Sequence, residues 1–312
     1  MDSKKNIAAV VVTYNRKELL RNCFDAILKQ TVKPSVVYII DNASTDGTME
    51  SVKNWGVYER AKDGIQFKYV LNPQNEGGAG GFYLGMKTAF DKGVYDGIWV
   101  MDDDGVPAPT CLEILLRYLG PYDFISPLVL SITNHNKAAF GDETYDDIKK
   151  AAKNNIIING SSLFNGVLLS TKLIETVGFP KKEMFIWGDE MNYEFRCVNC
   201  GFTSITCVDA IHYHPDNRQQ KVMTLTRRLI SITDVDWKLF YLVRNQTYNS
   251  LYVAPGSRLK HVLASLDNFL FYLYFFTFKK TGKAKIVLKA FSCAVRKDFR
   301  SYQEVMGGKH SI

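Results

Sequence analysis

The sequence is poor in cysteine, with six residues scattered over a length of 312. Only Cys197 and Cys200 have the C-x-x-C spacing that metal and redox sites share. No second pair completes a zinc site, and no strand precedes the motif as it does in a thioredoxin-type site. We therefore expect reduced thiols in a cytosolic protein, not a zinc-binding or disulfide-stabilised fold.

Features of secreted, membrane-spanning and disordered chains are also missing. The N-terminal apolar run is short, β-branched and ends in a turn, which is not the pattern of a signal peptide. The aromatic-rich segment 266–278 has thirteen residues, whereas a membrane-spanning helix needs about 20. The sequence contains no repeat or low-complexity segment, and its 46% apolar and 23% charged residues are an ordinary globular composition.

Acidic residues are scarce in the C-terminal part of the chain. Residues 258–312 contain eleven Lys and Arg against three Asp and Glu, a net charge of +8. The rest of the chain has 28 basic and 29 acidic residues, a net charge of −1. The basic character therefore belongs to the tail. Because the tail lacks the aromatic and basic pattern of a recognised nucleic-acid module, we do not expect nucleic acid as a partner.

What the sequence does contain is an alternation of strand and helix patterns. Continuous β-rich apolar runs are typical of strands buried on both faces, and segments with helical spacing separate them. The alternation predicts an α/β fold with a doubly wound, mostly parallel sheet. From Leu225 onward the chain reads as largely helical, so we expect a catalytic domain over 1–225 and a helical, basic region over 226–312. The expected strands are 7–13, 35–40, 67–71, 97–101, 123–131, 156–159, 164–170 and 203–208, and the expected helices are 16–30, 48–55, 80–92, 173–177 and 188–200.

Polar residues follow each of the first four expected strands. In such sheets, ligands bind beyond the carboxyl ends of the strands. Four successive strand ends with chemically rich residues therefore predict one site. These clusters are Tyr14-Asn15-Arg16, Asp41-Asn42, 72–81 and Asp102–Asp104.

The cluster Asp102-Asp103-Asp104 directly follows a buried strand. Three adjacent carboxylates repel each other unless a positive charge lies among them. Hard divalent cations prefer oxygen ligands and commonly bridge carboxylates to phosphates. Since alternate residues of a strand point the same way, Asp102 and Asp104 can share a metal while Asp103 faces elsewhere. The plainer interpretation is a solvated acidic turn helped by Gly105 and Pro107.

Two further clusters have weaker signals. Asp41 closes the second strand, where a carboxylate can accept hydrogen bonds from a base or a ribose hydroxyl. Asp46 is better explained as the cap of the next helix. The segment 75–81 is dense in glycine and opens a helix, which permits close approach to an anionic ligand. It follows the third strand and lacks the spacing of a dinucleotide fingerprint.

Taken together and in this order, six motifs resemble the family 2 glycosyltransferases, and the resemblance covers about residues 7–215. The combination of NEGGAGGF and MDDDG is most similar to the galactofuranosyltransferase and rhamnosyltransferase-like branch. The resemblance implies a GT-A fold and an inverting, metal-dependent hexosyltransferase. The motifs are VVVTYNR, IIDNASTDGT, NEGGAGGF, WVMDDDG, FNGVLLS and WGDEMNYEFR.

The resemblance also implies residue roles. It assigns the metal, Mn²⁺ or Mg²⁺, to Asp102, Asp104 and His214, with His212 as the less favoured histidine and a structural role open for both. It assigns the catalytic base to Asp189 and acceptor contacts to Trp187 and Glu190, with Glu190 as a rival base. Charge stabilisation at a helix N-terminus is the plainer explanation of this acidic pair. The residues assigned to the nucleotide sugar are Thr13, Tyr14, Arg16, Asp41, Asn75, Gly78, Asp102 and Asp103.

One departure from the family pattern and one unexplained motif remain. Relatives with a triple aspartate often carry WDD, whereas Gly188 here replaces the first aspartate of that pair. The segment 241–245, with the sequence YLVRN, also resembles a family motif. Its Arg244 is expected either to contact phosphate or to pair with an acid, and the sequence does not decide between them.

The expected donor is UDP-galactofuranose, with dTDP-rhamnose as the alternative, and the expected acceptor is a lipid-linked glycan of a cell-surface polysaccharide. A nucleotidyltransferase is disfavoured because no glycine-rich basic loop follows the first strand, and a non-catalytic nucleotide-sugar-binding protein is the remaining alternative. The segment 266–278 and the lysines after it suit a helix at an anionic membrane surface. Packing on the core or between copies of the chain explains them equally well. We expect a cytoplasmic protein, peripheral at the inner face of the membrane.

Overall fold

The computed structural model divides the chain into two compact units, which we describe separately. Unit 1 comprises 1–179 and 200–217, and unit 2 comprises 180–199 and 218–312. The boundary expected between residues 225 and 226 lies outside the described residues. The structure describes residues 5–56, 64–216, 220–224, 229–279 and 282–307.

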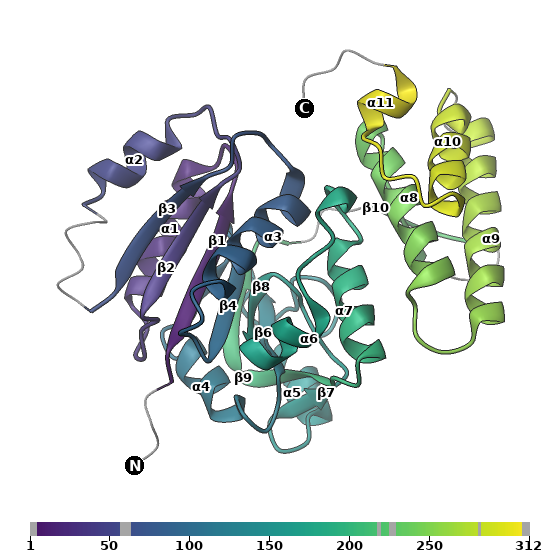
Figure 1. Ribbon diagram of the computed structural model, residues 1–312. Coiled ribbons are helices and arrows are strands. Elements are labelled where there is room, and N and C mark those ends of the chain that lie inside the picture. Colours follow the sequence, from purple (N-terminus) through teal and green to yellow (C-terminus); the bar gives the residue numbers. More distant parts are fainter. Residues whose placement is uncertain (1–4, 57–63, 217–219, 225–228, 280–281, 308–312) are drawn as a thin grey trace. The chain divides into compact units, whose positions relative to one another are not determined.

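Unit 1 is built on a nine-stranded mixed sheet with the order β3-β2-β1-β4-β8-β6-β9-β5, in which β7 also pairs with β9. The first four strands in this order are parallel, as the apolar runs predict (Figure 1). The predicted α/β class with a mostly parallel sheet and flanking helices is confirmed. The strands are β1 Ile7–Thr13, β2 Val36–Asp41, β3 Gln66–Leu71, β4 Gly97–Asp102, β5 Val106–Pro107, β6 Phe124–Ser131, β7 Ile156–Ile158, β8 Asn165–Ser170 and β9 Ser204–His214. The helices are α1 Lys17–Leu28, α2 Thr48–Asn54, α3 Gly77–Phe90, α4 Cys111–Tyr118, α5 Tyr145–Ala151 and α6 Thr171–Val177.

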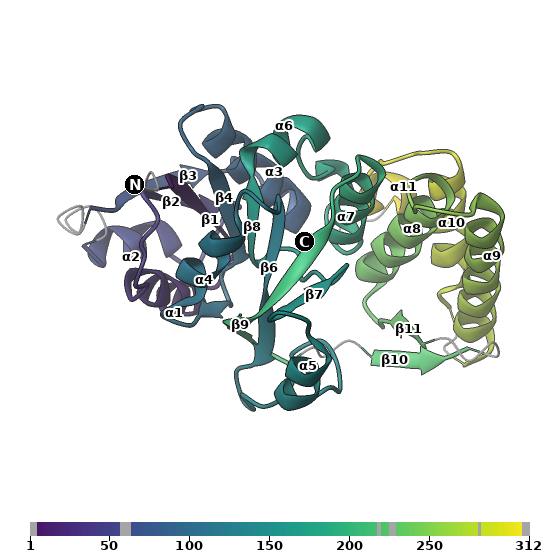
Figure 2. The same ribbon diagram turned by 90° about the horizontal axis from the view of Figure 1, so that it is seen from below.

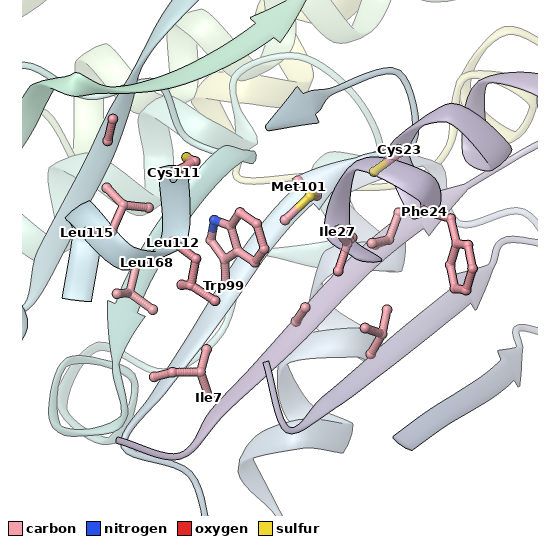
Figure 3. Close-up of a cluster of buried hydrophobic side chains, with 14 of the residues drawn as sticks. Ile7, Cys23, Phe24, Ile27, Trp99, Met101, Cys111, Leu112, Leu115 and Leu168 are labelled. Carbon is pink, nitrogen blue, oxygen red and sulfur yellow. The ribbon is translucent and has the colours of Figure 1, made fainter. Parts of the chain in front are cut away.

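The two faces of this sheet are packed differently. On one face, side chains of α1 and α4 enclose a core that includes Trp99 and Met101 of β4 (Figure 3). The Trp99 indole N–H donates to the Gly166 carbonyl at 2.8 Å, so this buried ring keeps a polar partner. On the other face, α3 lies close to the strands because Gly81 and Gly85 have no side chain. A Cβ on Gly81 would come within 2.4 Å of a Val12 methyl group.

Unit 2 contains a small hairpin and a group of helices (Figure 2). The prediction of helix from Leu225 is wrong at Leu229–Ile232, which forms strand β11 and pairs with β10 Gln220–Met223. In β11, Ile230 and Ile232 are buried while Leu229 is exposed, so the period of two typical of a strand prevails there. Residues 225–228 lie outside the described part. The helices are a 3₁₀ turn Lys182–Met184, α7 Asp189–Asn199, α8 Asp236–Tyr252, α9 Arg258–Tyr274 with a π-helical turn Phe275–Lys279, α10 Ala284–Val295 and α11 Tyr302–Met306.

The helical C-terminal region expected from the sequence is present. Its core consists of aromatic and aliphatic side chains of α8, α9, α10 and α11, among them Phe240, Tyr272 and Tyr302. Within the described ranges, no helix combines the length and apolarity needed to cross a membrane.

Candidate active site

Three strand ends meet at the carboxyl edge of the parallel part of the sheet. Thr13 pairs with Asp41 in the register of β1 and β2, and Val12 pairs with Asp102 in the register of β1 and β4. Thr13 and Asp41 are both buried, and Asp102 is half-buried. The residues that the sequence assigns to one edge therefore lie on adjacent strands.

Asp103 is held by residues that follow the first strand. The Thr13 hydroxyl donates to its Oδ2 at 2.7 Å, and an Arg16 N–H donates to its Oδ1 at 3.3 Å. Burial raises the pKa of Asp103 to about 6, against the opposing effects of the Arg16 charge and the Thr13 hydroxyl. Arg16 also reaches Asp104 at 3.1 Å. This half-exposed guanidinium thus supplies part of the positive charge that the aspartate cluster requires.

Asp104 and His214 form the second contact of the cluster. Oδ1 of Asp104 lies 3.2 Å from Nε2 of His214, and Nδ1 of the same ring lies 2.7 Å from the Pro215 carbonyl. Burial opposes a charge on this ring, but the hydrogen bond and negative charge of Asp104 raise the pKa of His214 above its ordinary value. If Nδ1–H donates to the carbonyl, Nε2 and Oδ1 are two acceptors facing each other. A proton or a cation between them would make that arrangement favourable.

This pair is the part of the predicted metal-ligand set that comes together. Among the residues that the structure describes, no group of three or more His, Cys, Asp or Glu side chains is arranged to hold a metal ion. The chemistry of Asp104 and His214 nevertheless fits a divalent cation, because a carboxylate oxygen and an imidazole nitrogen are both ordinary ligands of Mn²⁺.

His214 reaches Asp104 because β9 is longer than the expected strand 203–208. It runs from Ser204 to His214, with a register shift opposite Pro127 and Leu128 of β6. The sequence shows the two histidines on one face of an extended segment but does not show this pairing.

His212 has a different environment from His214. It is completely buried, and neither ring nitrogen has a hydrogen-bond partner among the described residues. Burial lowers the pKa of His212 to about 3. Added Cβ atoms would lie 2.1 Å from its Nε2 at Gly105 and 2.7 Å from its Nδ1 at Gly166. His212 therefore fills the space left by two glycines directly behind the aspartate cluster.

Asp41, at the end of β2, is held by two hydrogen bonds. Its Oδ1 accepts from the Ser44 N–H at 2.8 Å, and its Oδ2 accepts from the Tyr69 hydroxyl. These contacts hold the buried carboxylate at the end of β2. Tyr14, also assigned to the nucleotide sugar, is half-buried in the loop between β1 and α1.

An asparagine network fixes the start of the glycine-rich helix. Asn42 donates to the Asn75 side chain at 3.0 Å and to the Gly77 carbonyl at 2.9 Å, and Asn72 donates to Asn42 at 2.9 Å. Asn75 is thus engaged in positioning the first turn of α3. A Cβ on Gly78 would meet nothing within 4 Å, so open space surrounds this position. The glycine-rich segment therefore serves two purposes: Gly81 permits close packing, and Gly78 leaves a backbone accessible.

The predicted base and acceptor residues belong to unit 2. Asp189 and Glu190 form the first turn of α7, where Asp189 is buried. The loop before them has an unusual backbone, because Phe185, Trp187 and Gly188 have φ values of 66°, 58° and 93°. Left-handed conformations at bulky residues need support from the surroundings.

Three side chains of α8 provide that support. Asn245 lies within hydrogen-bond distance of the carbonyls of residues 184, 186 and 187, at 2.9, 3.0 and 2.7 Å. Arg244 donates to the carbonyls of residues 183, 184 and 300, at 2.9, 3.3 and 3.0 Å. Asn249 donates to the Gly188 carbonyl at 2.7 Å. We call Arg244, Asn245 and Asn249 the carbonyl clamp.

The clamp accounts for two features of the sequence. Among the described residues, Arg244 hydrogen-bonds to backbone carbonyls and to the Asn245 side chain, and none of its partners is an acidic side chain. Gly188 is required by space as well as by φ, since an added Cβ would lie 3.0 Å from Cβ of Asn245. An aspartate at this position, as in WDD relatives, would need a different loop. The motif YLVRN is the only sequence signal of the clamp.

Comparisons with known proteins agree with this architecture. Residues 8–163 match the model of glycosyl transferase family 2. The chain is 32% identical over 267 residues to the galactofuranosyltransferase GlfT1 of Mycolicibacterium smegmatis, covering 81% of this chain and 84% of that protein. It is 31% identical over 265 residues to GlfT1 of Mycobacterium tuberculosis, with the same coverage.

Two solved structures share the fold at low sequence identity. A mannosyltransferase from Pyrobaculum calidifontis, in complex with GDP-Man and Mn²⁺, has a TM-score of 0.58 at 15% identity and covers 95% of this chain and 76% of its own. S. aureus TarS 1-349 in complex with UDP-GlcNAc has a TM-score of 0.57 at 14% identity, covering 97% and 90%. At these identities the likeness establishes a GT-A fold and nothing finer.

Proposed function

Since the chain belongs to glycosyl transferase family 2, we propose that it moves galactofuranose from UDP-galactofuranose to a hydroxyl group of a growing, lipid-linked cell-surface polysaccharide. The observation that carries the proposal is the similarity to galactofuranosyltransferases over most of both chains. The carboxylates and amides at the strand ends of unit 1 support a nucleotide-sugar site.

In this proposal, unit 1 holds the donor. The buried carboxylate of Asp41 accepts hydrogen bonds from the nucleoside, and the open backbone at Gly78 lies at the N-terminus of α3, where an anion is favoured. Arg16 contributes positive charge beside the aspartates. Asp102, Asp104 and His214 are the candidate metal ligands. When bound, Mn²⁺ or Mg²⁺ supplies positive charge that stabilises the diphosphate leaving group.

Asp189 is the proposed catalytic base. The acceptor oxygen attacks the anomeric carbon, the bond from that carbon to the diphosphate oxygen breaks, and the hydroxyl proton passes to the Asp189 carboxylate. Attack from the face opposite the leaving group inverts the anomeric configuration. Trp187 and Glu190, on the clamped loop and the first turn of α7, are the proposed acceptor contacts.

The test is release of nucleoside diphosphate from a donor panel of UDP-galactofuranose, dTDP-rhamnose, UDP-GlcNAc and GDP-mannose, with a glycan acceptor present. Turnover of UDP-galactofuranose that stops with EDTA and returns with Mn²⁺ or Mg²⁺ is the expected result. Asp189→Asn should abolish transfer while donor binding, measured by calorimetry, is retained. Preferred turnover of dTDP-rhamnose would replace the donor assignment. If no donor is bound or turned over, the proposal fails.

A further inference from the structure

Helix α9 carries a continuous apolar face that is exposed. Six large apolar side chains recur every three or four residues, which places them on one side of a helix. Each is between 43% and 73% exposed. They are Leu259, Leu263, Leu266, Leu270, Tyr274 and Phe278, and we call them the α9 stripe.

This stripe is not the face with which α9 packs into unit 2. The packed side includes the buried Tyr272, whose hydroxyl donates to the Ser231 carbonyl at 2.8 Å. It also includes Phe269, which stacks on Phe291 of α10 at a centroid distance of 4.0 Å. The helix is therefore already held by one side and has a second apolar side left over. Contiguous exposed apolar surface of this kind marks an interaction site.

Basic residues near the α9 stripe indicate the charge of its partner. Exposed Arg258 and Lys260 flank Leu259 at one end of α9, and the adjacent helix α10 exposes Lys285 and Lys289. Residues 258–312 have a net charge of +8. Pairing of two copies through this face would bring like charges together. An anionic surface would instead bind the apolar stripe and the basic residues at the same time.

We propose that the α9 stripe binds the surface of an anionic phospholipid bilayer, with the helix lying in the plane of the interface. The leucines and aromatic rings would enter the boundary between headgroups and acyl chains, while the basic side chains contact lipid phosphates. From Leu259 to Phe278 the stripe extends on the order of 28 Å along the membrane plane. This binding goes beyond glycosyl transfer and does not depend on the identity of the donor.

The test is co-sedimentation of the full chain with two kinds of vesicle, phosphatidylcholine alone and equal parts phosphatidylcholine and phosphatidylglycerol. Leu263→Gln/Leu270→Gln should lower the partition coefficient at least about tenfold, because each leucine loses most of its transfer free energy. The matched control is Val94→Gln/Ile158→Gln in unit 1. Val94 and Ile158 are 59% and 58% exposed, which is close to the 58% and 61% of Leu263 and Leu270. The control should bind as the unchanged protein does.

A second set of variants separates the contribution of charged lipid headgroups from that of apolar contact. Lys285→Gln/Lys289→Gln should weaken binding to the anionic vesicles roughly fivefold per lysine and leave binding to neutral vesicles unchanged. Lys29→Gln/Lys92→Gln alters the net charge equally and should bind normally. Equal binding of the leucine variant and its control would overturn the proposal. So would a dimer in sedimentation velocity, without vesicles, that Leu263→Gln/Leu270→Gln converts to a monomer. Nucleotide release in solution, measured on the same variants, keeps this outcome separate from that of the transfer reaction.

Discussion

The carbonyl clamp makes a quantitative prediction for Asn245→Ala. The substitution removes an amide that lies 2.7 to 3.0 Å from three carbonyls of the loop before Asp189. An NH₂ group has two hydrogens, and the Met184 carbonyl keeps other donors, so the partly buried carbonyls of residues 186 and 187 are the two that lose this donor. At about 1–3 kcal/mol for each unsatisfied group, the free energy of unfolding should fall by roughly 2–6 kcal/mol.

Asn245→Ala should also lower the rate of the reaction. The backbone of Trp187 and Gly188 has positive φ, and without its partners it can relax toward ordinary conformations and move the first turn of α7. A shift of about 1 Å in a catalytic group can cost 10²-fold in rate. We therefore expect kcat to fall about a hundredfold. The affinity for the donor should stay unchanged because the residues proposed to bind it belong to unit 1.

Urea denaturation and steady-state kinetics on the same preparation measure both effects. Gln246→Ala is the matched control, since Gln246 is the neighbouring residue of α8 and accepts from Tyr272 instead of binding the loop. Asp189→Asn gives the kinetic limit for complete loss of the proposed base. The reasoning is refuted if Asn245→Ala keeps the kcat of the control, or if its loss appears in the KM for the donor and not in kcat.

Three further predictions concern unit 1 and the C-terminal turn. Gly81→Ala should lower the free energy of unfolding by about 1–3 kcal/mol because its Cβ would collide with Val12 of β1. Gly78→Ala in the same helix should be neutral or stabilising by up to about 1 kcal/mol. Thermal denaturation of the two variants measures the difference, and an equal loss of stability in both would contradict the prediction. Thr13→Val should cost roughly 1.5–3 kcal/mol by removing the hydroxyl that donates to buried Asp103, measured by urea denaturation against the unchanged protein. The hydrogen bond that the Arg300 side chain donates lowers the pKa of Asp298 from 3.8 to about 2. The ionised Asp298 therefore stabilises the fold above pH 3.8, and this stabilisation is lost as the pH falls toward 2. The loss of stability caused by Asp298→Asn should shrink as the pH falls from 3.8 to about 2. A loss that does not change with pH would contradict the prediction.

The sequence predicts the parallel half of the sheet well because the strands at 7–13, 35–40 and 97–101 are continuous apolar runs whose burial is a local property. It also brings the right strand ends together, since the carboxyl ends of parallel strands share one edge. Positions that depend on distant pairing are not predicted. The extension of β9 to His214 arises from pairing with β6, and β11 is fixed by its partner strand in a stretch that reads as helical.

Roles that depend on backbone atoms are also missed. A sequence pattern names Arg244 and Asn245, but it cannot show that their partners are carbonyl oxygens, which every residue possesses. It likewise cannot divide the glycine-rich segment into Gly81, which packs, and Gly78, which stays open. The assignment of a metal to Asp102, Asp104 and His214, and of the catalytic base to Asp189, stays a prediction from the family resemblance.

Unit 2 is formed from two separate stretches of chain, 180–199 and 218–312. This limits where the chain can be truncated or joined to part of a relative. The loop before Asp189 and the clamp on α8 are more than fifty residues apart in sequence, yet each completes the hydrogen bonding of the other. A chain truncated at residue 225 would keep the loop and lose every donor that the clamp provides. Exchange of C-terminal regions between relatives should therefore succeed only when 180–199 is exchanged together with 218–312, which would transfer the proposed acceptor contacts and the proposed membrane-binding helix as one unit.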